Sequence, residues 1–388
     1  MAEKGDFIMM RVLLTGGGSG GHVNPAIAIA DTIRMNQPDA EIAFVGVRGG
    51  KECDLVPRAG YPLFYVESQG IRRSLSPSNI KALMTALTSP HSKQTKDILT
   101  TFKPDIVIGT GGYVCWPLLR AAAIAGIPTM VHESNCQPGL AVKVLQYSVD
   151  TILLNFAETE QYLQKRKKCV VVGNPLRGGF GSISRADARA KLALGEDEML
   201  VLCSAGSHGS ASVNAAVLEM LRLLAPTRSN TRFVLSAGTK NIDTATALYR
   251  EYELDQCPNV VVQDYIYDMP IQVAAADVVI TRAGAMSLSE IARMGKASVV
   301  IPSPYVADNH QLRNAMAMAD RDAALMVEEK DFDCGALSRA VLSLLDDPDL
   351  RCKLQKNILS FSNVDANRLI YEQVVAAVDE YKKSKKKP

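Results

Sequence analysis

The sequence predicts an α/β protein made of two Rossmann-like domains, each a doubly wound parallel sheet covered by helices. The length of 388 residues exceeds one ordinary domain and suits two of about 150–200 residues each. Short apolar runs rich in β-branched residues alternate with longer helix-like segments along the chain. Glycine-rich or polar turns follow several of these runs directly, at the place where parallel sheets bind their ligands.

The apolar runs fall into two series, one for each predicted domain. The first series covers residues 11–17, 41–47, 104–112, 129–134 and 151–156. The second series covers residues 199–207, 232–238, 259–265, 277–284 and 297–302. Near-continuous apolar strands separated by helices indicate parallel sheets that are buried on both faces. Because ligands bind beyond the carboxyl ends of such strands, we expect the two domains to face each other across a cleft.

The domain boundaries follow from a change of composition between the two series. From about residue 173 to residue 198, glycine, proline, serine and charged residues replace the apolar runs. We therefore expect an N-terminal domain over residues 1–175 and a C-terminal domain over residues 176–365. The last segment, 366–388, begins with an amphipathic pattern that predicts a helix.

The composition is that of a globular protein, because 47% of the residues are hydrophobic and 22% are charged. The net charge of +2 is too small to indicate a nucleic-acid partner. Five lysines nevertheless crowd the C-terminus, at positions 382, 383, 385, 386 and 387. They form either a solvated tail or a contact with anionic lipid, which is worth about 1 kcal/mol for each lysine near a membrane surface.

Cysteine usage and hydropathy favour a cytosolic protein. The eight cysteines are scattered without a paired spacing, which is typical of reduced thiols. The start of the chain contains no apolar segment of the kind that signal peptides carry. No stretch approaches about 18 uninterrupted apolar residues, so any membrane contact is expected to be peripheral.

A glycine-rich loop, Gly-Gly-Gly-Ser-Gly-Gly-His over residues 16–22, follows the first strand and opens a helix. Glycines let the backbone approach an anion closely, and the N–H groups at a helix start favour negative charge. His22 is either a polar helix-start residue or an imidazole aimed at a substrate phosphate or hydroxyl. The glycine spacing also fits a dinucleotide fingerprint. The next strand offers Arg48 in place of the ribose-binding carboxylate, so an NADP-dependent dehydrogenase is one alternative.

Two further polar turns follow strands of the first series. Residues 111–113, Gly-Gly-Tyr, come after one strand, and residues 132–135, His-Glu-Ser-Asn, come after the next. Glycines after a buried strand also make ordinary tight turns, but two such loops at one sheet edge favour a ligand site. Residues 132–135 lack the second histidine of a zinc-binding helix, and the five histidines show no metal-ligand spacing. We therefore expect no catalytic metal and no cofactor.

The second series carries polar turns of its own. Residues 204–210 and 281–290 each join a strand to a helix start through small residues. Glu290 either complements the dipole of its helix or accepts the ribose hydroxyls of a nucleotide whose phosphates lie at the helix start. We favour the ribose interpretation. Residues 308–311, Asp-Asn-His-Gln, are either an exposed loop or a cluster that hydrogen-bonds sugar hydroxyls.

Seven stretches, in order and over nearly the whole chain, resemble the MurG family of undecaprenyl-diphospho-muramoylpentapeptide β-N-acetylglucosaminyltransferases, which have the GT-B fold. They cover residues 16–30, 109–114, 132–145, 173–177, 205–214, 281–292 and 308–315. The resemblance implies an inverting glycosyltransferase of peptidoglycan synthesis, peripheral at the cytoplasmic face of the cell membrane. It would move GlcNAc from UDP-N-acetylglucosamine (UDP-GlcNAc) to the 4-hydroxyl of a polyprenyl-diphosphate-linked MurNAc-peptide. An anionic membrane surface would be a further partner, and no nucleic-acid partner is expected.

The resemblance also assigns roles to individual residues. Those implied to bind UDP-GlcNAc are Ser19, Gly20, Gly21, Asn135, Arg177, Ser207, Ile266, Ala285, Met286, Ser287, Glu290, His310 and Gln311. Those on the acceptor side are Gly18, Gly111, Gly112 and Tyr113. His22 is the first candidate for the catalytic base and Glu133 the second. Loop N–H groups and Arg177 would meet the charge that develops on UDP in place of a divalent cation. The terminal helix is expected to return to the N-terminal domain.

The chain departs from the family pattern at three positions. Ser134 replaces a glutamine, Ala205 a glycine and His310 a glutamine, and none of these changes removes an obvious catalytic group. The alternatives are another GT-B transferase with a lipid acceptor, a UDP-sugar 2-epimerase-like enzyme, and a catalytically silent scaffold. Residues 71–84 mix cations with apolar side chains, and they form either a membrane-docking surface or a helix packed on the sheet.

Overall fold

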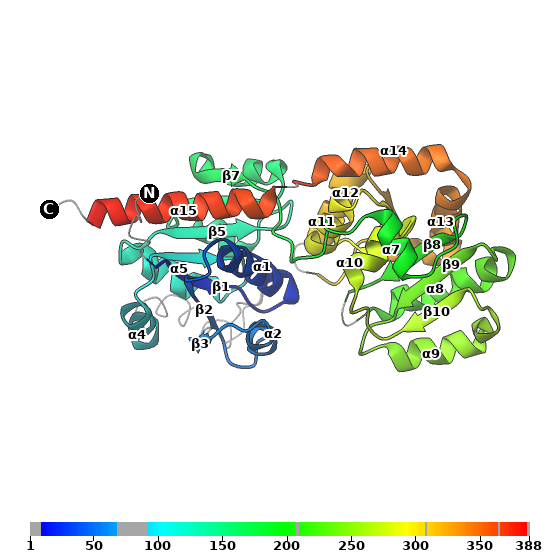
Figure 1. The fold of residues 1–388 in the computed structure, drawn as a ribbon, viewed down its shortest axis with the longest axis horizontal. Coiled ribbons are helices and arrows are strands. Elements are labelled where there is room, and N and C mark those ends of the chain that lie inside the picture. The colour runs from blue at the N-terminus through cyan, green and yellow to red at the C-terminus, as the bar shows by residue number, and fades with distance from the viewer. Residues whose placement is uncertain (1–8, 68–91, 207–208, 307–308, 364, 386–388) are drawn as a thin grey trace, which may run out of the picture. The chain divides into compact units, whose positions relative to one another are not determined.

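The computed structural model describes residues 9–67, 92–206, 209–306, 309–363 and 365–385. The chain divides into two compact units, and each unit is described by itself. The N-terminal unit consists of Met1–Arg177 together with Asp365–Pro388, and the C-terminal unit consists of Gly178–Val364. Each unit contains a parallel sheet with helices on both faces (Figure 1), which confirms the predicted fold class.

The described part of the N-terminal unit holds a seven-stranded parallel sheet in the order β3-β2-β1-β4-β5-β6-β7. Its strands are β1 Arg11–Thr15, β2 Glu41–Gly46, β3 Leu63–Tyr65, β4 Ile106–Gly109, β5 Thr129–Glu133, β6 Thr151–Leu154 and β7 Cys169–Val171. Its main helices are α1 Gly20–Asn36, α2 Glu52–Arg58, α4 Lys93–Phe102, α5 Cys115–Ile124, α6 Leu140–Leu145 and α15 Ala366–Lys385. The strand order reverses between β1 and β4, so the loops after these two strands lie at the switch point.

The sheet has a hydrophobic core on each face, which explains its nearly continuous apolar strands. Successive residues of a strand point to opposite faces. Val12 and Leu14 of β1 pack into the core beneath α1 and α15, whereas Leu13 packs into the core with α4, α5 and α6. Because all three side chains are completely buried, no position in the middle of β1 can be polar.

Helix α15 packs on the N-terminal unit against α1. Ile370, Val374 and Val378 are spaced by one helical turn and are buried in the same core as α1. Each such side chain contributes about 1.5–3 kcal/mol by leaving water. The side-chain amide of Asn367 accepts a hydrogen bond from the Leu176 N–H at 3.0 Å and donates one to the Leu176 carbonyl at 2.9 Å. The start of α15 is therefore hydrogen-bonded to residue 176, near the end of the first part of the N-terminal unit.

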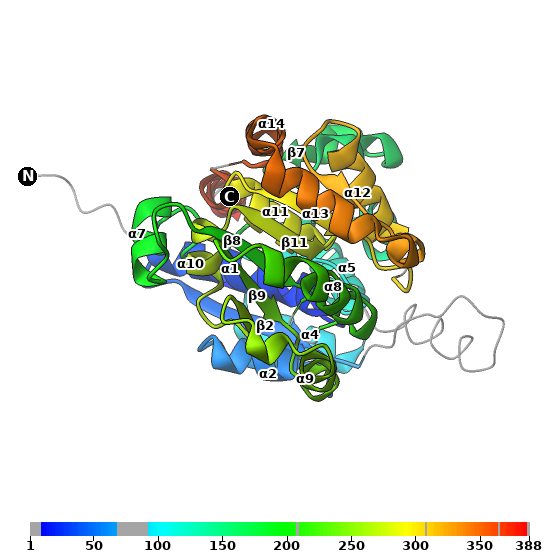
Figure 2. The ribbon, with the colours of Figure 1, turned by 90° about the vertical axis from the view of Figure 1, so that its right-hand side faces the viewer.

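The described part of the C-terminal unit holds a six-stranded parallel sheet in the order β10-β9-β8-β11-β12-β13. Its strands are β8 Met199–Ser204, β9 Thr231–Ser236, β10 Val260–Gln263, β11 Val278–Arg282, β12 Ala297–Ile301 and β13 Leu325–Met326. Its main helices are α7 Arg185–Lys191, α8 Ala211–Leu224, α9 Ile242–Glu251, α10 Met269–Ala275, α11 Ala285–Arg293, α12 His310–Ala319, α13 Ala336–Asp346 and α14 Pro348–Ile358. Figure 2 shows the helices and strands of this unit from a second direction. Its switch point lies between β8 and β11.

Candidate functional site

In the N-terminal unit, the loops after β1 and β4 meet because the two strands are neighbours, with Thr15 opposite Gly109. Gly111 and Gly112 have φ values of +105° and +84°, a region that glycine adopts without strain. A Cβ atom on Gly112 would lie 2.3 Å from the carbonyl oxygen of Gly17. Glycine is therefore required where the two loops touch. The predicted glycine-rich segments do come together at one sheet edge.

His22 lies in this contact, in the first turn of α1. Its Nδ1 is 3.0 Å from the carbonyl oxygen of Gly17 and 3.3 Å from the Ser19 hydroxyl. A carbonyl oxygen can only accept, so Nδ1 carries the proton and Nε2 is the acceptor nitrogen. Burial lowers the pKa of His22, against the opposing effects of the Gly17 hydrogen bond and the charge of Glu52. The imidazole is therefore neutral at neutral pH, as a general base must be.

The imidazole and a phenol ring line the glycine loops closely. A Cβ atom on Gly111 would lie 2.7 Å from Cδ2 of His22, and one on Gly18 would lie 3.2 Å from Cε1 of Tyr113. Burial raises the pKa of Tyr113, and the charge of Glu52 raises it further. Tyr113 is therefore a neutral phenol in the working range of pH. The four predicted acceptor-side residues all lie within this loop contact.

Glu133 anchors the turn that follows β5. Its Oε1 accepts hydrogen bonds from the main-chain N–H of Asn135 at 2.9 Å and from the side-chain amide of Asn135 at 3.1 Å. Its Oε2 accepts a hydrogen bond from the N–H of Gly139 at 2.8 Å, just before α6 begins. Both oxygens of this buried carboxylate are thus engaged. The geometry favours a role in positioning Asn135 over a role as the base.

Arg177 lies at the end of the N-terminal unit, where its guanidinium contacts α1. Its Nε is 3.2 Å from Oδ2 of Asp31, and Oδ1 of the same carboxylate accepts a hydrogen bond from the Tyr61 hydroxyl at 2.8 Å. The Arg177 side chain is half exposed. In this structure the guanidinium thus binds a carboxylate, and a diphosphate would have to share it with Asp31.

In the C-terminal unit, the loops after β8 and β11 meet in the same way, with Ser204 opposite Thr281. Arg282, the last residue of β11, fastens them together. Its Nη2 donates to the Ser210 hydroxyl at 2.7 Å, and its Nη1 lies 2.6 Å from Oε1 of Glu329. Ser207, predicted to bind the donor, lies outside the described residues.

The predicted donor-binding turn starts α11. Gly284 is the residue before the helix, and the first turn of any helix presents N–H groups without an intrahelical partner. Ala285, Met286 and Ser287 form this turn, and Glu290 lies in the next one. Burial raises the pKa of Glu290 to about 7. A nucleotide whose phosphates meet the helix start would place its ribose near such a carboxylate.

Three further donor-binding predictions, Ile266, His310 and Gln311, lie in the C-terminal unit, whereas Ser19, Gly20, Gly21, Asn135 and Arg177 lie in the N-terminal unit. Gln311, in the first turn of α12, accepts a hydrogen bond from the N–H of Ser303 through its Oε1 at 3.0 Å. It therefore ties α12 to the loop after β12. His310 is the first residue of that helix, and Ile266 is buried after β10.

Two residues with a place in these sites were not among the sequence predictions. Arg282 is one, and its position at the end of a strand next to the predicted turn was the available signal. Glu52 is the other. It is a carboxylate with 1% exposure beneath the glycine loop, and its Oε2 lies 3.4 Å from the N–H of Gly18. No motif marks Glu52 in the sequence.

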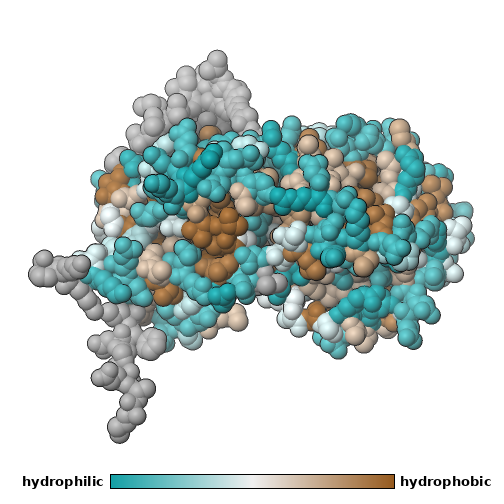
Figure 3. Space-filling view, turned by 90° about the horizontal axis from the view of Figure 1, so that it is seen from above, coloured by the Kyte–Doolittle hydropathy of each residue, from teal (hydrophilic) through white to brown (hydrophobic). Residues whose placement is uncertain are grey.

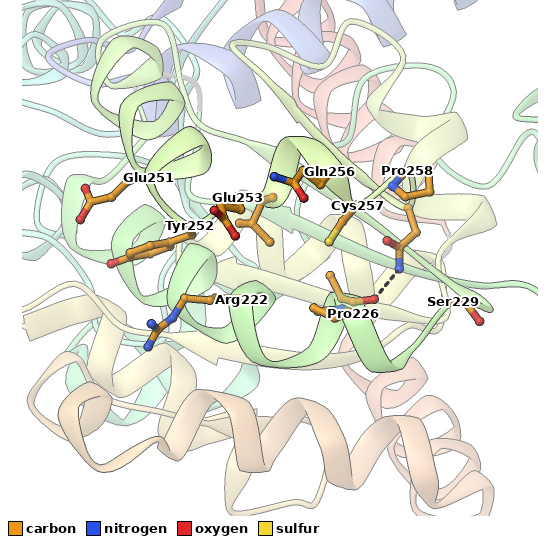
Figure 4. A pocket seen from close by; sticks show the side chains of 12 residues that line it. Arg222, Pro226, Ser229, Glu251, Tyr252, Glu253, Gln256, Cys257 and Pro258 are labelled. Carbon is orange, nitrogen blue, oxygen red and sulfur yellow. Dashed lines mark hydrogen bonds between the residues drawn. The ribbon is translucent and has the colours of Figure 1, made fainter.

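A cavity of about 670 Å³ lies in the C-terminal unit, at the edge of its sheet opposite the switch point (Figure 4). Arg222, Tyr252, Glu253 and Cys257 line it, together with Asn259, which directly precedes β10. The Asn259 amide is already satisfied by main-chain oxygens. Because none of the predicted site residues lines this cavity, the candidate site is assigned to the switch points instead.

The described residues contain no cluster of three or more His, Cys, Asp or Glu side chains placed to hold a metal ion. Within the same residues, no helix combines the length and hydropathy that a bilayer crossing requires. The segment 71–84, predicted as a possible docking surface, lies outside them.

Comparison with known proteins defines the class first. The N-terminal domain model of glycosyltransferase family 28 matches residues 12–154, and the C-terminal domain model of that family matches residues 200–369. The two models together cover both switch points and all strands of the two sheets except β7. The fold and the paired sheet edges are therefore those of a family 28 glycosyltransferase.

The curated relatives narrow the class. A protein of Caldanaerobacter subterraneus is 40% identical over 94% of this chain and 99% of its own length, and one of Clostridioides difficile is 36% identical over 98% and 92%. The chain belongs to the family of these relatives, the UDP-N-acetylglucosamine–N-acetylmuramyl-(pentapeptide) pyrophosphoryl-undecaprenol N-acetylglucosamine transferases.

Solved structures share the fold. MurG of Acinetobacter baumannii matches with a TM-score of 0.75 at 23% identity, over 95% of this chain and 99% of that chain. A UDP-GlcNAc 2-epimerase of Neisseria meningitidis, bound to UDP-GlcNAc, matches with a TM-score of 0.64 at 13% identity, over 95% and 100%. The same architecture thus occurs in a transferase and in an epimerase.

Proposed function

We propose that this chain transfers N-acetylglucosamine from UDP-GlcNAc to the 4-hydroxyl of MurNAc-(pentapeptide)-pyrophosphoryl-undecaprenol, with inversion at the anomeric carbon. The names of relatives at 34–40% identity support this substrate pair. The observation that carries the chemistry is the imidazole of His22, held by the Gly17 carbonyl so that Nε2 is the acceptor nitrogen.

The proposed reaction is a single displacement. The 4-hydroxyl oxygen of the acceptor forms a bond to the anomeric carbon of GlcNAc. The bond from that carbon to the β-phosphate oxygen breaks, and UDP leaves with its electron pair. Nε2 of His22 takes the hydroxyl proton. Attack from the side opposite the leaving group converts the α-linked donor into a β-linked product, and a well-placed base contributes about 10²- to 10⁴-fold.

The C-terminal switch point is proposed to hold the donor. Main-chain N–H groups at the start of α11 would meet the diphosphate, because a helix start carries partial positive charge. The carboxylate of Glu290 would accept the ribose hydroxyls. Arg282 supports this role because it holds the hydroxyl of Ser210, directly before α8. Ser207, Ile266, Met286, His310 and Gln311 complete the proposed set.

The N-terminal switch point is proposed to present the acceptor. Gly18, Gly111, Gly112 and Tyr113 form its floor around His22, and Glu133 holds Asn135 in place. Ser19, Gly20 and Gly21, at the start of α1, would support the donor diphosphate during transfer. Arg177 would add a positive charge by sharing its guanidinium between Asp31 and the diphosphate.

We further propose that the enzyme works as a peripheral protein on an anionic membrane at the cytoplasmic face. Hydrophilic side chains cover most of the face drawn in Figure 3, with apolar side chains in a few patches. The surface formed by α6, Tyr147 and residues 162–167 suits such docking, and Nζ of Lys165 lies 5.6 Å from the centroid of the Tyr147 ring within it. Its exposed apolar members are Leu140, Val144, Tyr147 and Tyr162. Its cations are Lys143, Lys165, Arg166 and Lys167. Apolar side chains next to cations favour anionic interfaces.

Liposome flotation tests the docking surface. The double variant Leu140→Ser with Lys165→Glu should bind anionic vesicles more weakly than the wild type, whereas Leu223→Ser, at an exposed apolar position on α8, should not. Equal flotation of the double variant and the wild type would assign membrane binding to another part of the chain.

Product analysis tests the reaction itself. Incubation with UDP-GlcNAc and the lipid acceptor should yield a lipid heavier by one N-acetylhexosamine, with a β-configured new linkage. Formation of an epimerised sugar without any acceptor would instead favour the 2-epimerase reaction of the structural relatives. An unchanged lipid together with intact UDP binding would favour the silent scaffold.

A further inference from the structure

Glu52 is a buried carboxylate whose surroundings are built from glycines. A Cβ atom would lie 2.6 Å from its Oε1 at Gly17, 2.4 Å from the same oxygen at Gly50, and 2.5 Å from its Cγ at Gly46. The side chain therefore fits only because these three positions lack one. Burying a carboxylate is costly unless it is hydrogen-bonded, so this arrangement calls for a reason.

Main-chain N–H groups contact both oxygens of this carboxylate. Oε1 accepts a hydrogen bond from Val47 at 3.1 Å, and Oε2 accepts one from Gly18 at 3.4 Å. Among the described lysines and arginines, none forms an ion pair with Glu52. The charge is thus held by the loops after β1 and β2, without a neutralising cation from the described residues.

The Gly18 N–H belongs to the same peptide group as the Gly17 carbonyl. In a trans peptide these two groups point in opposite directions. Glu52 accepts a hydrogen bond from the N–H of this peptide. The carbonyl oxygen of the same peptide, which points the opposite way, accepts the Nδ1 proton of His22 at 3.0 Å. Hydrogen bonds in such a chain polarise one another. The peptide connects the carboxylate to the imidazole.

We propose that Glu52 is a positioning residue of the transfer reaction, which orients His22 and supports its basicity through the Gly17–Gly18 peptide. The inference rests on the proposed function, because it assumes that His22 is the base. In a serine protease triad, an aspartate hydrogen-bonded to the histidine orients the imidazole. Here Glu52 would have that role without touching the imidazole directly.

The electrostatics around His22 agree with this geometry. Among the described charged groups, Glu52 on α2 is the one whose charge acts on the pKa of His22. Ser19, which precedes the same helix as His22, contributes an uncharged hydroxyl. Tyr113 after β4 stays neutral, and so does Cys115 on α5, because burial raises the pKa of that thiol to about 12. The negative charge of Glu52 raises the pKa of His22 against the effect of burial.

The test combines steady-state kinetics with a double-mutant cycle. Glu52→Gln should lower kcat about 10- to 100-fold, by analogy with the loss of the hydrogen-bond partner that orients a metal-binding histidine, with the KM for UDP-GlcNAc within twofold. The acidic limb of the pH profile should move to lower pH, because the imidazolium loses its stabilising charge. In a His22→Ala background, Glu52→Gln should have no further effect on kcat. Asp54→Asn, an exposed ion-pair residue on the same helix, is the matched control.

Nitrogen-15 NMR of the histidines in substrate-free protein gives a readout that does not need turnover. The wild type should show His22 protonated at Nδ1, and Glu52→Gln should lower its pKa. If Glu52→Gln does not fold, Glu52→Asp, which is too short to reach Gly18, should give the same direction. An additive double variant, or an unshifted His22 titration, would overturn the role of Glu52. Absence of transfer by the wild type would instead overturn the proposed function.

Discussion

Nδ1 of His22 lies 3.0 Å from the main-chain oxygen of Gly17, at the point where the loops after β1 and β4 meet. This contact fixes the tautomer of the imidazole and leaves Nε2 to accept a proton. It also connects a glycine-rich motif to a chemical task. The glycines bring two strand ends close enough to hold a neutral imidazole.

Replacing His22 with alanine should lower kcat about 10²- to 10⁴-fold, because the acceptor hydroxyl loses its base. UDP binding, measured by calorimetry, should stay nearly unchanged because the proposed uridine site lies in the other unit. Turnover close to that of the wild type would remove His22 from the mechanism.

Gly111→Ala should lower kcat about 10²-fold, because its methyl group would press on the imidazole and move it out of line. The positive φ adds a backbone cost of about 1–2 kcal/mol. Gly126→Ala is the matched control, since Gly126 has a φ of +69° and nothing within 4 Å of an added Cβ. Both variants should lose thermal stability, and only Gly111→Ala should lose activity. Equal activities would contradict the proposed contact.

Donor affinity should rise with pH around neutrality. Burial raises the pKa of Glu290 to about 7, so the carboxyl is largely protonated below that pH and ionised above it. The ionised form accepts both ribose hydroxyls, whereas the protonated form loses acceptor capacity. The KM for UDP-GlcNAc should therefore fall as the pH increases through about 7.

Glu290→Gln should remove this pH dependence and raise the KM about tenfold, the equivalent of one hydrogen bond to a charged group. Glu219→Gln, at an exposed position on α8, serves as the control. A pH dependence that persists in Glu290→Gln would assign the titration to another group.

Arg282→Met should weaken both donor binding and the C-terminal unit. The change leaves Glu329 without its 2.6 Å ion pair and releases the Ser210 hydroxyl. Loss of one partner of a buried pair costs about 3–5 kcal/mol. Arg228→Met, which breaks an exposed pair with Asp346, should cost no more than about 1 kcal/mol. Thermal unfolding and the KM for UDP-GlcNAc check both effects, and similar results for the two variants would contradict the role of Arg282.

The sequence predicts the central strands well and the sheet edges poorly. Strands such as β1 are buried on both faces, so their residues must be apolar throughout, and this pattern is visible without a structure. Strands β3, β7 and β13, which have two or three residues, were not predicted because such short edge strands carry little pattern. The predicted strand over 104–112 was too long. It ends at Gly109, because Gly111 and Gly112 turn the chain with positive φ.

The site residues, like the strands, were predicted in part. Loops with many glycines after strands could be recognised because backbone geometry demands that residue type. The partners of individual side chains could not, because they depend on which strands become neighbours. Glu133 turned out to hold Asn135 and Gly139, and Arg177 to contact Asp31. Glu52 lies 34 residues from Gly18 in the chain and acquires its place only when α2 packs beneath the first loop.

The most direct measurement is the rate of UDP release from UDP-GlcNAc, with and without the lipid acceptor, in excess chelator. We predict that release requires the acceptor, matches the β-linked product in amount, and continues at full rate when divalent cations are removed. Release that proceeds equally well without the acceptor, or that stops on chelation, would contradict the proposed displacement by a lipid-linked hydroxyl with His22 as base.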